Sequence, residues 1–171
     1  MAGTLYLIAT PIGNLEDMTY RAVRLLGEVD LIAAEDTRNS IKLLNHFDIK
    51  TPMTSYHEHN KYEKAQVLVG KLLEGMNIAV ITDAGTPGIS DPGEEITKQC
   101  YEAGMKVVPV PGACAAVNAL IASGQATRRF AFEAFLPMDK KERQAVLAEL
   151  ARETRTMVVY EAPHRLKKTL Q

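Results

Sequence analysis

The sequence predicts an α/β protein, and three observations support this. Short apolar runs alternate along the chain with segments of helical periodicity, the pattern of a sheet flanked by helices. Loops rich in Gly, Pro and Asp follow several of these runs. The 171 residues, 46% of them hydrophobic, are enough for one full core and part of a second. We therefore expect a mostly parallel N-terminal sheet with flanking helices, followed by an incomplete second α/β lobe.

The expected strands are runs of four to six mainly aliphatic and aromatic residues. The clearest covers residues 78–82, Ile-Ala-Val-Ile-Thr, because it breaks abruptly into Asp83-Ala-Gly-Thr-Pro-Gly88. The full set is 5–9, 31–34, 78–82, 107–110, 130–135 and 157–160, with a weaker candidate at 53–56.

The expected helices lie between these strands. The helix over 140–152 is the best defined, since Asp139 can cap its first amides and Glu142 can reach back to complete a capping box. Its apolar stripe is Val146, Leu147 and Leu150. The others are 18–26, 41–47, 61–74, 94–102 and 115–122.

A boundary between two lobes is expected near Pro109-Val-Pro-Gly112, where proline and glycine interrupt the pattern. We expect an N-terminal α/β domain over residues 1–113 and the start of a second over 114–171. The last five residues resemble the opening of a helix without a glycine stop or a closing strand, so we expect the second domain to be truncated.

Charge and cysteine content restrict the partners and the compartment. A net charge of -1 gives no global attraction to nucleic acid or membrane, so an RNA partner needs a local basic patch. Cys100 and Cys114 form no C-x-x-C pair, and the chain opens directly into a strand without a targeting segment. No apolar run approaches the roughly 20 residues of a membrane span. We expect a cytoplasmic protein.

The loops that follow the strands are the candidate binding residues, because doubly wound sheets bind ligands at the carboxyl ends of their strands. Neither a phosphate-binding G-x-x-x-x-G-K-[ST] loop nor a G-x-G-x-x-G fingerprint is present. His57 and His59 could share one face of a strand, but no further thiol or carboxylate completes a known metal spacing, and we expect no metal. The loops are 10–14, 35–38, 83–88, 111–114 and 161–165.

These loops resemble those of the tetrapyrrole methylase superfamily and, within it, the ribosomal RNA small subunit methyltransferase I branch. The similarity spans nearly the whole chain. It rests on Leu5-Tyr-Leu-Ile-Ala-Thr-Pro-Ile-Gly-Asn-Leu-Glu-Asp-Met-Thr19, Ala34-Glu-Asp-Thr-Arg38, the loop 83–93, Pro111-Gly-Ala-Cys114 and Tyr160-Glu-Ala-Pro-His-Arg165.

The resemblance implies a two-lobed fold that binds S-adenosylmethionine and methylates the ribose 2'-hydroxyl of a cytidine in the decoding region of 16S ribosomal RNA. It also implies a homodimer acting on the small ribosomal subunit. The cofactor-binding positions that it implies are Pro11, Asp83, Ala84, Gly85, Gly88, Cys114, Ala115 and Glu161.

The catalytic candidates lie after the second strand. The resemblance implies Asp36 as the acceptor of the ribose proton, and Glu35 could exchange roles with it. Asp36 could instead cap a helix beginning near Ser40. Arg38 is either the salt-bridge partner of these acids or a clamp for an RNA phosphate.

Two other functions compete with RNA methylation. Methylation of a corrin or porphyrin precursor shares cofactor and fold, but Thr10-Pro-Ile-Gly-Asn14 departs from the glycine-rich first loop of those branches. The other alternative is a cofactor-binding module without catalysis.

Overall fold

The computed structural model describes residues 1–171 and divides into two compact units, Met1–Cys114 and Ala115–Gln171. The first unit contains a sheet of five parallel strands in the order β3-β2-β4-β1-β5. Strand β1 lies between β4 and β5 and pairs with both, so that Leu5 lies opposite both Ile78 and Val107. The strands are β1 (Thr4–Ile8), β2 (Leu31–Ala34), β3 (Met53–Ser55), β4 (Ile78–Ile81) and β5 (Lys106–Val110).

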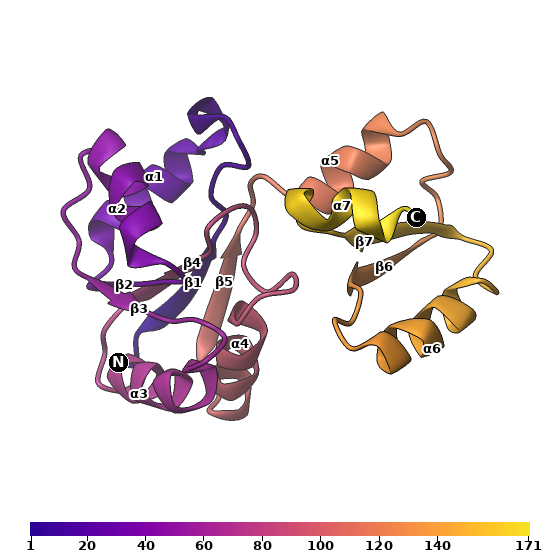
Figure 1. Ribbon diagram of the computed structural model, residues 1–171. Coiled ribbons are helices and arrows are strands. Elements are labelled where there is room, and N and C mark those ends of the chain that lie inside the picture. The colour runs from indigo at the N-terminus through magenta and orange to yellow at the C-terminus, as the bar shows by residue number, and fades with distance from the viewer. The chain divides into compact units, whose positions relative to one another are not determined.

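The helices of the first unit cover both faces of this sheet (Figure 1). The connections β1 to β2 and β2 to β3 run toward one edge, and those from β3 to β4 and β4 to β5 run toward the other. Because such crossovers are right-handed, the two pairs of helices lie on opposite faces. They are α1 (Tyr20–Glu28), α2 (Thr37–His46), α3 (Lys61–Leu73) and α4 (Gly93–Glu102).

Successive side chains of a strand point to opposite faces of the sheet, and each face therefore has its own hydrophobic core. In β4, Ile78 and Val80 pack with α3 and α4, whereas Ala79 and Ile81 pack with α1 and α2. All four residues are at most 1% exposed, as expected for a strand buried on both faces. The direction of the connections reverses between β1 and β4, and this is where open α/β sheets bind ligands.

The second unit is built around one parallel pair of strands. Tyr160 packs its ring edge-on against Phe132 and Phe135, and its hydroxyl accepts a hydrogen bond of 3.1 Å from the amide of Ala116. A register shift in β6 accompanies Ala134, whose φ is +53°. The elements are α5 (Ala115–Ala122), β6 (Phe130–Phe135), α6 (Lys140–Leu150), β7 (Thr156–Tyr160) and α7 (Pro163–Thr169).

Two expected helices differ from the structure. Helix α2 begins at Thr37 rather than Ile41, because the carboxylate of Asp36 accepts the amide hydrogen of Arg38 and starts the helix a turn earlier. Polar residues fill that first turn, so that apolar periodicity could not reveal it. Helix α7 begins at Pro163, before the expected opening at 167–171, with proline at its first position.

Candidate functional site

The loops after β1 and β4 are joined at the carboxyl edge of the first unit's sheet. Thr10 and Gly85 form an isolated antiparallel bridge, with N···O distances of 2.9 and 3.0 Å in the two directions. The hydroxyl of Thr10 also donates to the carbonyl of Thr82 at 3.1 Å. Both threonines are buried, so these bonds form away from solvent and hold the two loops in register.

The loop after β5 joins the same cluster through Ala113. The hydroxyl of Thr86 donates to the carbonyl of Ala113 at 2.8 Å. Gly85 has a φ of +88°, and a Cβ there would lie 3.4 Å from Cγ2 of Ile12 and 3.6 Å from the oxygen of Ala113. Glycine therefore permits the backbone conformation, while an added Cβ would lie at ordinary van der Waals distance from both neighbouring loops.

Asp91 closes the loop between β4 and α4 on itself. Its carboxylate accepts the amide hydrogens of Gly88 at 2.9 Å, Ile89 at 3.1 Å and Gly93 at 2.8 Å. A Cβ at Gly93 would lie 2.6 Å from the nitrogen of Gly88, so the turn has no room for a side chain there. The amide of Gly88 is thus already bonded within the loop.

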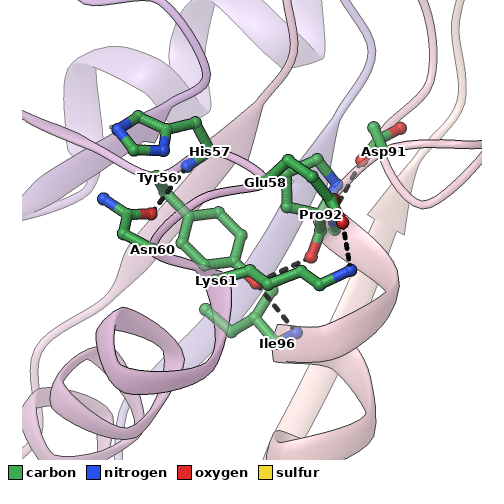
Figure 2. Close-up of polar contacts among 9 residues, drawn as sticks. Tyr56, His57, Glu58, Asn60, Lys61, Asp91, Pro92 and Ile96 are labelled. Carbon is green, nitrogen blue, oxygen red and sulfur yellow. Dashed lines mark hydrogen bonds and ion pairs between the residues drawn. The ribbon is translucent and has the colours of Figure 1, made fainter.

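Tyr56, directly after β3, fastens the start of α4 (Figure 2). Its hydroxyl donates to the carbonyl of Pro92 at 2.7 Å and accepts from the amide of Ile96 at 3.1 Å. The residue is 1% exposed, and burial raises the pKa of its phenol. Figure 2 also shows an ion pair of 2.5 Å between Lys61 and Glu58, in the segment that follows Tyr56. The site loop is therefore braced from β3 as well as from β1 and β5.

Two carboxylates, Glu35 and Asp83, follow neighbouring strands β2 and β4. The amide of Asp83 approaches Oε2 of Glu35 at 3.5 Å, and Nδ2 of Asn39 approaches Oδ2 of Asp83 at 3.4 Å. Burial raises the pKa of Glu35, the neighbouring acids Asp83 and Asp91 raise it further, and the amide of Asp83 opposes the rise. The carboxylate of Glu35 is therefore a stronger base than that of an exposed glutamate.

The surroundings of Asp36 lower its pKa, whereas those of Glu35 raise the pKa of that residue. The carboxylate of Asp36 accepts two hydrogen bonds from the guanidinium of Arg38, from Nε to Oδ1 at 3.0 Å and from Nη2 to Oδ2 at 2.7 Å. Hydrogen bonds from the side chain and backbone of Arg38 lower the pKa of Asp36 to about 2. The predicted salt bridge is thus present, together with the capping role, and the predicted proton transfer by Asp36 stays a prediction.

A hollow of about 310 Å³ opens between the first loop and helix α2. It includes Pro11 and Asp83, two of the predicted cofactor-binding residues. Its lining is Thr10, Pro11, Gly13, Asn14, Leu15, Asn39, Lys42, Leu43 and Asp83.

Ala84 is exposed in the loop after β4, where its carbonyl lies 3.4 Å from the hydroxyl of Thr82. The last three predicted site residues lie at the end of the first unit and in the second. Cys114 is half-buried and ends the first unit, and Ala115 begins α5. Glu161 accepts hydrogen bonds from the hydroxyl of Thr169 at 2.6 Å and from the amide of Ala162 at 2.8 Å, which lower its pKa. Glu161 also forms an ion pair with Arg165 at 3.0 Å.

Two residues outside the predicted site, Tyr56 and Asp91, also shape these loops. Asp91 stands between Ser90 and Pro92-Gly93, a combination typical of a side-chain-closed turn, and could have been found from it. Tyr56 carries no such signal, because its partner carbonyl is 36 residues away.

The structure brings together no group of three His, Cys, Asp or Glu side chains suited to a metal ion. His57 and His59 pack ring against ring, with centroids 5.9 Å apart. None of the helices combines the length and apolarity that a bilayer crossing requires.

The fold and its loops belong to a known class. The family model of tetrapyrrole (corrin/porphyrin) methylases matches residues 4–171, and the chain belongs to that family. Among solved structures, diphthine synthase aligns with a TM-score of 0.71 at 13% identity, covering 94% of this chain and 66% of that one. Uroporphyrin-III-C-methyltransferase of Thermus thermophilus aligns with a TM-score of 0.59 at 24% identity, covering 79% of this chain and 60% of that one. At these identities the likeness shows the fold alone.

Curated relatives are much more similar in sequence. The ribosomal RNA small subunit methyltransferase I of Synechocystis sp. is 60% identical over 168 residues, which are 98% of this chain and 60% of the relative. The protein of the same name from Haemophilus influenzae is 56% identical over 171 residues, covering 100% of this chain and 60% of the relative. The chain thus spans about three-fifths of the length of these relatives.

Proposed function

We propose that the protein transfers a methyl group from S-adenosylmethionine to the ribose 2'-hydroxyl of a cytidine in 16S ribosomal RNA. The observation that carries the proposal is the union of the loops after β1, β4 and β5 at the point where the sheet connections reverse. The names of the 50–60% identical relatives support the RNA substrate over a corrin or porphyrin precursor.

The loop cluster suits this cofactor. S-adenosylmethionine is a sulfonium with a flat adenine and a ribose diol, which small side chains and backbone groups accommodate better than a phosphate nest. Gly85, which joins the loops after β1 and β4 through its backbone bridge to Thr10, exposes no side chain of its own to such a ligand. We assign the cofactor to Pro11, Asp83, Ala84, Gly85, Gly88, Cys114, Ala115 and Glu161.

When bound, the cofactor supplies an electrophilic methyl group, and the protein's residues must position the acceptor oxygen and take its proton. Positioning alone can supply effective molarities up to roughly 10⁵–10⁸ M. Glu35 suits the proton-accepting role better than Asp36, because a general base works best when its pKa approaches the working pH. Asp36, with a pKa of about 2 and an arginine on both oxygens, is the weaker base.

The cellular setting is part of the proposal. We assign the protein to the cytoplasm, as a homodimer that acts on 16S ribosomal RNA within the small ribosomal subunit. The homodimer rests on the family resemblance of the loops alone.

The test is transfer of labelled methyl from S-adenosylmethionine to small ribosomal subunits, to bare 16S transcript and to a corrin precursor. We expect label on the RNA of the subunits. Label on the corrin precursor and none on RNA would replace the proposed substrate, and binding of cofactor without any transfer would leave a non-catalytic module.

A pair of isosteric variants tests the catalytic assignment. Glu35→Gln should lower turnover about 10²- to 10⁴-fold, the usual contribution of a general base, while its calorimetric cofactor affinity stays near that of the parent. Asp36→Asn, which keeps the side-chain shape, should lose much less turnover. The reverse order of the two losses would assign proton transfer to Asp36.

A further inference from the structure

The hollow beside the cofactor loops is lined by a lysine, two asparagines and two leucines as well as by residues of those loops. We propose that it receives the acceptor nucleotide of the RNA and that Lys42 binds a phosphate of that nucleotide. This inference rests on the proposed function and adds to it the surface that the substrate occupies.

The position of the hollow suits the acceptor nucleotide. Pro11 and Asp83 belong both to the hollow and to the loops assigned to the cofactor, so that a ligand in the hollow lies next to those loops. Its opposite wall is the face of α2 that carries Asn39, Lys42 and Leu43, spaced three and four residues apart. The volume of about 310 Å³ is near the lower limit of roughly 300 Å³ for ligand pockets. One nucleotide matches this size better than a macrocycle of four pyrroles.

Lys42 is the cation that remains available on this wall. Arg38, one turn earlier on α2, is held by both oxygens of Asp36. The structure gives Lys42 no ion pair, although Asp83 lines the same hollow. A lysine ammonium at the rim of a pocket is a common contact for an RNA phosphate.

The other lining residues match a nucleoside. Asn14 uses its Oδ1 to accept the amide hydrogen of Glu16 at 3.0 Å, and Asn39 uses Nδ2 toward Asp83 at 3.4 Å. Each amide therefore keeps a further donor or acceptor for a base edge or a ribose hydroxyl. Leu15, 43% exposed, and Leu43 add apolar surface for an unstacked base. Recognition of single-stranded RNA combines these same elements.

The experiment measures methyl transfer to small ribosomal subunits at several salt concentrations with Lys42→Ala, Lys42→Arg and a control. Removal of one charge-assisted phosphate contact should raise KM for the subunit about tenfold. It should also reduce the slope of log affinity against log salt concentration by about 0.7–0.9. Cofactor affinity by calorimetry should not change, and Lys42→Arg should restore most of the KM.

The control is Lys106→Ala, since Lys106 is exposed at the opposite end of the sheet, at the start of β5. It should keep the KM and salt slope of the parent. If the parent methylates subunits and Lys42→Ala keeps the parent's KM and salt slope, the inference is wrong while the proposed function stands. A loss of cofactor affinity in Lys42→Ala would also overturn it, because the hollow would then belong to the methyl donor. A parent that methylates no RNA would remove the proposed function itself.

Discussion

The two units differ in how completely secondary structure covers their sheets. In the first unit five strands are enclosed by two helices on each face, and residues such as Leu68, Leu72 and Ile96 are fully buried. In the second unit a single pair of strands leaves Phe135 46% and Met157 40% exposed, and α6 contributes no buried residue. The packing of the first unit therefore holds its loops rigidly. The loops of the second unit are supported by fewer buried side chains.

This difference separates the predicted site residues into two groups. Gly85 is fixed from both sides by the bridge to Thr10 and by the approach of Ala113. Glu161 precedes the short helix α7 and is held by contacts to Arg165 and Thr169 of that helix. Preorganised groups bind ligands with less loss of entropy, so the loops of the first unit should contribute most of the specific binding of the methyl donor.

The largest effect should come from a pair of leucine truncations, one in each unit. Leu68→Ala removes a fully buried side chain from the α3 face and should lower the free energy of unfolding by about 2–5 kcal/mol. Leu147→Ala, in α6, removes a side chain that is 44% exposed and should cost less than about 1 kcal/mol. Urea unfolding measures both. Equal losses would mean that the second unit is packed as tightly as the first.

A smaller effect is expected from two glycines with positive φ. Gly85→Ala introduces backbone strain into the loop that is bridged to Thr10, and it should weaken S-adenosylmethionine binding about tenfold. Gly104→Ala, with a φ of +66° and open space around it, introduces the strain alone and should leave affinity unchanged. Calorimetric titration with S-adenosylmethionine compares the affinities of the two variants. Equal weakening would show that general destabilisation, not the site, is responsible.

The smallest effect concerns two exposed pairs of the same kind. Asp36 with Arg38 in the first unit and Glu153 with Arg155 in the second each have an acid whose pKa is lowered to about 2 by the arginine two residues later. Such a pair stabilises the fold above the acid's unfolded pKa, near 4, and this stabilisation is lost as pH falls toward 2. Asp36→Asn and Glu153→Gln should therefore each flatten the acid limb of a plot of Tm against pH. An unchanged limb in both variants would show that neither pair contributes.

The parallel sheet could be predicted because its inner strands β2 and β4 are apolar on both faces and the loops after its strands are rich in glycine and proline. Residues 78–82 show this best, since burial on both faces makes the run continuous. The start of α2 could not be predicted from periodicity, because its first turn is polar and depends on a side-chain cap by Asp36. The site loops could be predicted because they follow the carboxyl ends of the strands, whereas the roles of individual residues within them came from the family resemblance.

The contacts that define the site were less predictable than its loops. The bond between Tyr56 and Pro92, and that between Thr10 and Thr82, join residues 36 and 72 positions apart. Their existence depends on strand order, which local sequence does not encode. For the same reason the contrast between Glu35 and Asp36, adjacent residues with shifts in opposite directions, emerged only from burial and from the position of Arg38.

The most direct test of a methyl-donor site at the carboxyl edge of the five-stranded sheet is hydrogen–deuterium exchange with and without S-adenosylmethionine. Saturating cofactor should slow exchange in the loops 10–14, 83–88 and 111–114 and leave the opposite edge, at 75–77 and 104–106, unchanged. Protection at the opposite edge, or in none of the three loops, would contradict the assignment of the site.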